Sequence, residues 1–78
     1  MNEEYKAIIL AALDENDSMV NAGQEAFLLA ELRSAREELR SNTGLLLNAS
    51  TANLDNATLS VQLAVDKINW LIRCLGSL

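Results

Sequence analysis

Three arginines have the most chemically suggestive spacing in this sequence. Arg33, Arg36 and Arg40 are separated by three and then four residues, which places them on one stripe of a helix. Guanidinium groups bind phosphate and carboxylate oxygens through paired hydrogen bonds, so this stripe suits an anionic ligand. The alternative is a solvated surface on which Glu37 and neighbouring acids pair with the arginines.

A stretch rich in Asn, Thr and Leu follows these arginines, at residues 42–59. If the flanking helices form a hairpin, the hydroxyls of Thr43, Ser50 and Thr51 would lie near Arg40. Backbone amides at the start of the next helix would add further donors for an anion. The predicted ligand-binding residues are therefore Arg33, Arg36, Arg40, Thr43, Ser50 and Thr51.

The residues usually used in catalysis are scarce. The chain has no His to act as a base, and its one cysteine, Cys74, is flanked by Ile72 and Leu75. Such a cysteine is expected to be a small buried apolar residue. Glu37 and Glu38 are adjacent, so on a helix their side chains point apart. We expect no enzymatic activity, no catalytic residue and no cofactor.

An acidic segment partly matches a calcium-binding loop. Asp14, Asn16, Ser18 and Glu25 occupy positions 1, 3, 5 and 12 of such a loop, between two predicted helices. Position 6 requires glycine for a sharp turn, and here it is Met19. We therefore predict an ordinary acidic turn and no metal site, with calcium as the open alternative.

The short length of the chain predicts that it associates with itself. Its 78 residues allow one domain, and a core this small rarely balances the entropy of ordering the chain. One cysteine excludes an intrachain disulfide, and the absence of His removes the usual zinc ligand. The apolar fraction of 50% is high for a small acidic chain, so we expect a homo-oligomer.

The net charge of −5 excludes some partners and suggests a compartment. A field of this sign repels DNA and RNA backbones. No stretch approaches the ~20 apolar residues of a membrane span, and no secretory signal is visible. With a free cysteine as well, we expect a reducing, cytoplasmic location.

The composition favours an all-α fold. The chain has no Pro and three Gly, and it is rich in Ala, Leu and Glu. Apolar spacing predicts one domain over residues 1–78, with helices at about 3–14, 19–41 and 53–75. The second helix is expected to stop near Asn42, with Gly44 as a left-handed cap and the leucines of residues 45–47 turned inward. Whether the first two helices are continuous stays open.

Heptad spacing joins the last two predicted helices. The second helix carries Leu28, Leu32, Ala35 and Leu39, and the third carries Leu54, Ala57, Val61, Ala64, Ile68, Leu71 and Leu75. Two such seams predict a long antiparallel helical hairpin preceded by a short helix. The third helix has a further apolar face, which is expected to drive self-association, formed by Leu59, Leu63, Val65, Trp70 and Ile72. We interpret Trp70 and Tyr5 as core or interface anchors rather than as residues that stack on a ligand ring.

Residues 58–75, TLSVQLAVDKINWLIRCL, resemble the last helix of a known group of proteins. These are the small phage-encoded nucleotide sponges that counter the CBASS and Thoeris defences. The shared features are a Ser/Thr-Leu start, a central acidic residue, a large apolar residue and a basic residue, here Thr58, Leu59, Asp66, Trp70 and Arg73. Residues 31–42, ELRSAREELRSN, are compatible with the first arm of the hairpin. The chain departs from the family at residues 64–67, which are Ala-Val-Asp-Lys in place of a Leu-Glu-Glu-Ala run.

The resemblance implies a small helical oligomer that sequesters a cyclic nucleotide without cleaving it. If phage-encoded, such a protein would act in the host cytoplasm. Our first hypothesis is therefore an oligomeric, non-enzymatic binder of a nucleotide immune signal. The alternative is an acidic adaptor or inhibitor that binds a host protein, because the chain up to Arg40 carries an excess of acids. A nucleotide that raises the melting temperature would favour the first hypothesis.

Overall fold

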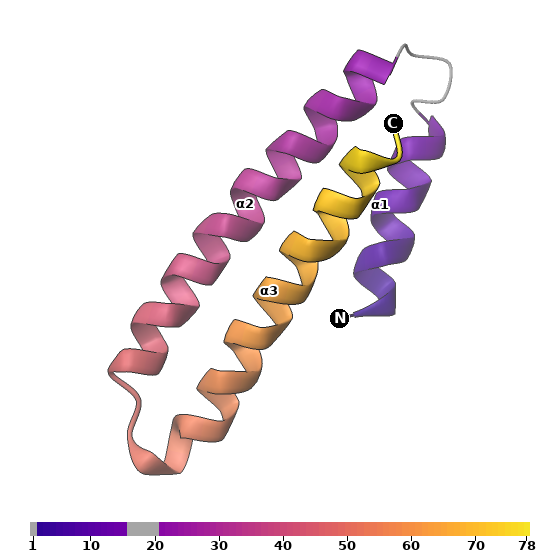
Figure 1. The fold of residues 1–78 in the computed structure, drawn as a ribbon. Helices are drawn as coiled ribbons and strands as arrows, with labels where there is room; N and C mark the ends of the chain where they lie inside the picture. Colours follow the sequence, from indigo (N-terminus) through magenta and orange to yellow (C-terminus); the bar gives the residue numbers. More distant parts are fainter. Residues whose placement is uncertain (1, 16–20) are drawn as a thin grey trace.

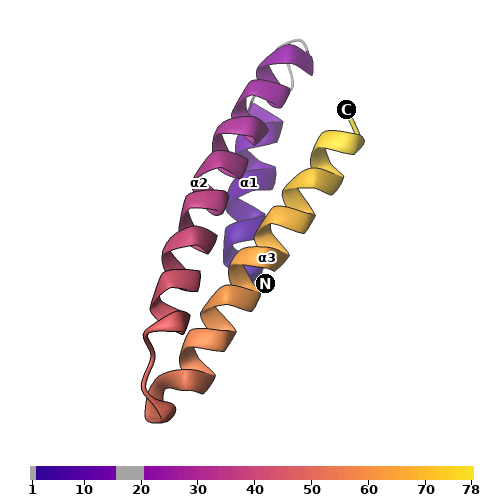
Figure 2. The same cartoon turned by 60° about the vertical axis from the view of Figure 1, so that its left-hand side comes forward.

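The computed structural model describes residues 2–15 and 21–78, and within these residues it is all-helical. The elements are α1 (Glu3–Glu15), α2 (Asn21–Leu47), a short 3₁₀ helix η1 (Thr51–Asn53) and α3 (Leu54–Gly76). Helices α2 and α3 form a long antiparallel hairpin, and α1 lies beside α3 near the open end of that hairpin (Figures 1 and 2). The molecule is elongated, with extents of 49 × 19 × 16 Å.

Helix α1 begins with a side-chain cap formed by Asn2. The backbone N–H of Glu4 donates to Oδ1 of Asn2 at 2.8 Å. Two acids, Glu3 and Glu4, occupy the first turn, where negative charge complements the helix dipole. Tyr5 and Ile9 recur at helical spacing on the side that packs against the core, and Ile9 is buried.

The predicted seams form the core between α2 and α3. Leu28 and Ala35 of α2 and Ala64 and Leu71 of α3 are buried. The two alanines have small side chains, which allows the helix backbones to approach closely at their level. The other seam residues of α2 are half-buried, and so are most of those of α3. The antiparallel hairpin is therefore confirmed.

Helix α2 does not stop near Asn42, and this prediction was wrong. It continues through Gly44 to Leu47, and no glycine in the described part of the chain has a positive φ. Three leucines follow Gly44, and their high helix propensity extends the helix. The amide of Asn48 donates to the Gly44 carbonyl at 2.9 Å and so satisfies one of the carbonyls at the helix end.

Two of the three leucines at the hairpin tip point outward, contrary to prediction, whereas Leu46 is half-buried. Leu45 is 64% exposed and Leu47 is 81% exposed. The tip extends past α1 (Figure 1), so no third helix is present there to bury them. The connection between α2 and α3 is only residues 48–50 followed by η1, which leaves no room for an inward crossing.

Helix α1 covers only part of the second apolar face of α3. Trp70 is half-buried in the core cluster together with Tyr5 and Leu13 of α1. The other residues predicted for that face are exposed, namely Leu59, Leu63, Val65 and Ile72. At 100° per residue, Val65 and Ile72 lie on the opposite side of the Leu71 row from Leu63 and Trp70, so the predicted single face is two flanks. None of the helices in the described part of the chain has the length and hydrophobicity of a membrane span.

Candidate binding site

A groove of about 320 Å³ lies between α2 and α3. Its lining is four apolar side chains and two arginines, namely Leu29, Leu32, Ile68, Ile72, Arg33 and Arg36. Two residues of α2 form hydrogen bonds with α1: Glu31 accepts one from Tyr5, and Gln24 donates one to the carbonyl of Leu13. At 100° per residue, Arg36 and Glu31 lie on opposite sides of the buried row of Leu28 and Ala35. The groove is therefore on the flank of the hairpin away from α1.

Within the described residues, no ion pair joins the two arginines of the groove to an acid. The ion pairs within residues 2–15 and 21–78 join Lys6 to Glu3 and Lys67 to Glu38, so neither involves Arg33 or Arg36. Both arginines are exposed. Their exposure fits the solvated surface of the alternative interpretation, but no ion pair with Glu37 occurs within the described residues. The guanidinium donors of the groove are available to an anion from outside.

The structure separates the six predicted ligand residues. Arg33 and Arg36 line the groove, whereas Arg40 is exposed on α2 and does not line it. The hydroxyl of Thr43 donates to the carbonyl of Leu39 at 2.7 Å, so it is bonded to the preceding turn of its own helix. The remaining two residues, Ser50 and Thr51, lie at the hairpin tip. The extra turn of α2 beyond Asn42 carries that tip past the arginines.

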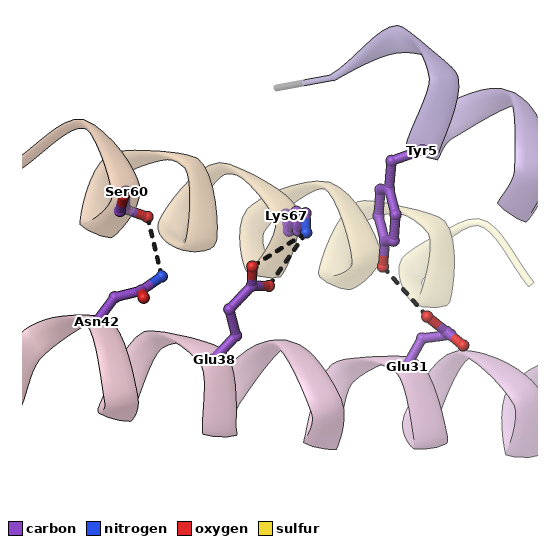
Figure 3. Close-up of polar contacts among 6 residues, drawn as sticks. All are labelled: Tyr5, Glu31, Glu38, Asn42, Ser60 and Lys67. Carbon is purple, nitrogen blue, oxygen red and sulfur yellow. Dashed lines mark hydrogen bonds and ion pairs between the residues drawn. The ribbon is translucent and has the colours of Figure 1, made fainter. Parts of the chain in front are cut away.

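Ser50 lines a second hollow, of about 490 Å³, at the hairpin tip. The hollow is lined by amide, hydroxyl and apolar groups and by no cation. Two of its amides hold the local backbone: Asn42 donates to the carbonyl of Ser60 at 3.4 Å (Figure 3), and Asn48 donates to that of Gly44. The Asn-rich composition of residues 42–59 is thus used largely to build the tip. The hollow therefore has hydrogen-bond donors but no guanidinium or ammonium group to pair with an anionic ligand.

A polar cluster fastens α1 to the hairpin (Figure 3). Lys67 Nζ lies 3.1 Å from a carboxylate oxygen of Glu38 and 4.7 Å from the centre of the Tyr5 ring. The Tyr5 hydroxyl donates to Glu31 at 3.3 Å, and its ring meets Trp70 edge-on with centroids 6.3 Å apart. Burial, followed by the nearby charge of Glu31, raises the pKa of Tyr5 to about 12. Tyr5 and Trp70 are thus core anchors, as interpreted from the sequence.

Sequence reasoning did not identify this cluster. Tyr5 is 26 residues from Glu31, and Lys67 is 29 residues from Glu38, so no local spacing links these pairs. Only the antiparallel register brings Glu38 opposite Lys67. The cluster positions α1 and leaves the opposite flank, with the groove, uncovered.

The other candidate groups make no site. Cys74 is half-buried, and burial raises the pKa of its thiol, which lowers the fraction of reactive thiolate. No group of three or more metal-ligating side chains occurs among the residues that the structure describes. Two of the calcium candidates, Asn16 and Ser18, lie outside those residues.

Comparison with protein families, with curated proteins and with solved structures gave no match to this chain. The groove and its arginines are therefore the features from which function is argued.

Proposed function

We propose that this protein is a non-enzymatic binding protein that captures an anionic ligand in the groove between α2 and α3. The observation that carries the proposal is the position of Arg33 and Arg36. They border an apolar groove, and no carboxylate in the described chain pairs with them. Sequestration of a nucleotide immune signal, which the resemblance to the phage sponges implies, is the specific form we favour.

The chemistry of the groove supports a ligand with two different parts. The floor, formed by Leu32, Ile68 and neighbouring aliphatic side chains, takes a flat or apolar body. The two guanidinium groups take phosphate oxygens through paired hydrogen bonds. Phosphate is the group that a nucleotide supplies, and its base supplies the flat body. No reacting group lies in the groove, so the ligand is held and not converted.

The test is a thermal melt with a panel of cyclic di- and trinucleotides. A ligand at 100 times its dissociation constant stabilises the protein by about 2.7 kcal/mol, which is a measurable rise in melting temperature. Arg36→Gln should abolish the rise. Arg73→Gln is the matched control, since it removes the same charge from α3 without altering the groove. An equal loss of the rise in both variants would point to a general charge effect and reject the groove as the site.

A second candidate is an adaptor or inhibitor that binds a host protein. It is favoured by the outer surface of α1, where Ile8 is 61% exposed and Leu10 is 50% exposed in a helix with four acids. This candidate predicts no melting shift with any nucleotide. It also predicts that a photo-crosslinking residue at Ile8 captures one defined host protein, and that the same residue at Asn69 on the last helix does not.

A further inference from the structure

The hollow at the hairpin tip is separate from the groove between α2 and α3. The two share no lining residue, so an inference about one does not depend on the other. The tip hollow has a volume of about 490 Å³, which is within the range of small-ligand sites. It lies where α2, η1 and α3 meet, on the part of the hairpin that extends past α1 (Figure 1).

The walls of the tip hollow are polar but carry no charge. Residues 41–54 contain no Asp, Glu, Lys or Arg, although the chain as a whole has a net charge of −5. Three lining residues are apolar, namely Leu45, Ala49 and Ala57, and the others have an amide or a hydroxyl group. A charged ligand would meet no group of opposite charge in this lining, so the hollow suits a neutral ligand. The polar lining residues are Asn42, Asn48, Ser50, Asn53, Asn56 and Ser60.

Half of these polar side chains do not hold the tip together. Ser50 and Asn53 directly precede η1 and α3, where such side chains normally cap a helix, but neither forms a cap hydrogen bond. The side chain of Asn56 is exposed and forms no hydrogen bond within residues 2–15 and 21–78 either. The donors and acceptors of these three residues are therefore available to a ligand in the hollow.

A sugar ring matches this combination of groups. A side-chain amide presents an acceptor and two donors in one plane, and two adjacent sugar hydroxyls pair with it, one as donor and one as acceptor. The C–H face of the ring would pack on Leu45, which is 64% exposed. An apolar ligand would leave the amides buried and unpaired, which disfavours its binding.

A smaller pocket of about 280 Å³ adjoins the tip hollow on the side of α1. Both are lined by Asn42 and Ser60, whose hydrogen bond bridges α2 and α3 next to the ion pair of Glu38 and Lys67 (Figure 3). Because Glu38 and Lys67 neutralise each other, this pocket also suits a neutral ligand. It gives a ligand in the hollow room to extend toward Asn2 at the start of α1.

We propose that the tip hollow is a binding site for a neutral saccharide. The amides of Asn53 and Asn56 pair with the hydroxyls of one ring, and Leu45 lies against its C–H face. A second ring occupies the adjoining pocket, beside Glu38 and Lys67. This site is additional to the groove and takes a ligand of different charge.

The test is an NMR titration of the isotope-labelled full chain with glucose, maltose, lactose and chitobiose. At least one of them should shift the backbone amide signals of residues 42–60 in a saturable manner. A disaccharide that binds should also shift the signals of Glu38 and Lys67. Its O-methylated form keeps the acceptors but has no donors, and it should bind about tenfold more weakly because the amide oxygens stay unpaired.

Asn56→Ala is the variant that locates the site. It removes a paired hydrogen bond to the ligand, so the saccharide should bind about tenfold more weakly. The melting temperature of the free protein should not fall, because the Asn56 side chain is exposed and unbonded in the described chain. Asn69→Ala is the matched control, since Asn69 is an exposed amide of the same helix that does not line the hollow. It should leave the affinity unchanged.

Three results would overturn the proposal: no saturable shift with any of the saccharides, shifts spread evenly over the whole chain, or equal affinity in Asn56→Ala and the wild type. An uncharged peptide that shifts residues 42–60 when no saccharide does would show that the ligand class is wrong. A bound disaccharide that leaves Glu38 and Lys67 unshifted would reject the position of the second ring. None of these results bears on nucleotide binding in the groove.

Discussion

The hydroxyl of Tyr5 gives a measurable test of how α1 is held. The variant Tyr5→Phe keeps the ring that lies under Lys67 and against Trp70, and it removes the hydrogen bond to Glu31. At 3.3 Å and in a half-buried position, this bond is an ordinary one, so the free energy of unfolding should fall by about 0.5–1.5 kcal/mol at pH 8. Trp70 is the only tryptophan in the chain, so its fluorescence follows denaturation directly.

The pH dependence of the free energy of unfolding distinguishes the contribution of the Tyr5 hydroxyl from that of other residues. The pKa of Tyr5 rises from 10.0 to about 12 on folding, because burial and Glu31 disfavour the ionised form. The folded state therefore holds the proton more tightly than the unfolded state. The stability that this adds is complete below pH 10 and is lost as the pH rises toward 12.

The assay is urea denaturation of the wild type and of Tyr5→Phe between pH 8 and pH 12. The stability advantage of the wild type should shrink over the range from pH 10 to 12. The Cys74 thiol also has a raised pKa, but it titrates in both proteins and cancels in the difference. An advantage that stays constant or grows up to pH 12 would refute the reasoning. It would mean that neither burial nor Glu31 raises the pKa of Tyr5.

Three further predictions concern stability and reactivity. Leu71→Ala should lower the free energy of unfolding by about 2–5 kcal/mol in urea denaturation, since Leu71 is fully buried, whereas Leu59→Ala at an exposed site should cost much less. Gly44→Ala should raise the melting temperature, with a gain of about 0.5–1 kcal/mol, because Gly44 is helical and nothing lies within 4 Å of an added Cβ. A loss of stability there would mean that the end of α2 is not helical. Cys74 should react with a disulfide reagent more slowly in the native chain than in urea, and its native rate should still be rising above pH 9.

Much of the fold was predictable from spacing. The steps of three and four between apolar residues identified the rows that contain Leu28, Ala35 and Leu71, and the structure buries these residues between α2 and α3. Helical periodicity is a local property, so it can be read without knowing what packs on it. The cap that Asn2 forms at the start of α1 is also a local feature, because it joins residues two apart in the chain.

The end of α2 was not predictable in this way. Gly44 suits a left-handed cap, but it also fits within a helix when strong helix formers follow it, as Leu45 does here. The longer helix moved the tip, exposed two of its three leucines and separated Ser50 from the arginines of the groove. The wrongly predicted end of α2 is therefore the reason that the predicted ligand-binding residues do not lie together in the structure.

The sequence by itself determined the helical class, the seam residues and the stripe of arginines, because each depends on periodicity along one helix. The tertiary structure decided which flank stays open. The docking of α1 through Tyr5, Glu31 and Lys67 covers one side of the hairpin and leaves Arg33 and Arg36 beside an apolar groove on the other. Which flank stays open depends on contacts between residues far apart in the chain, and a local sequence pattern does not reveal such contacts.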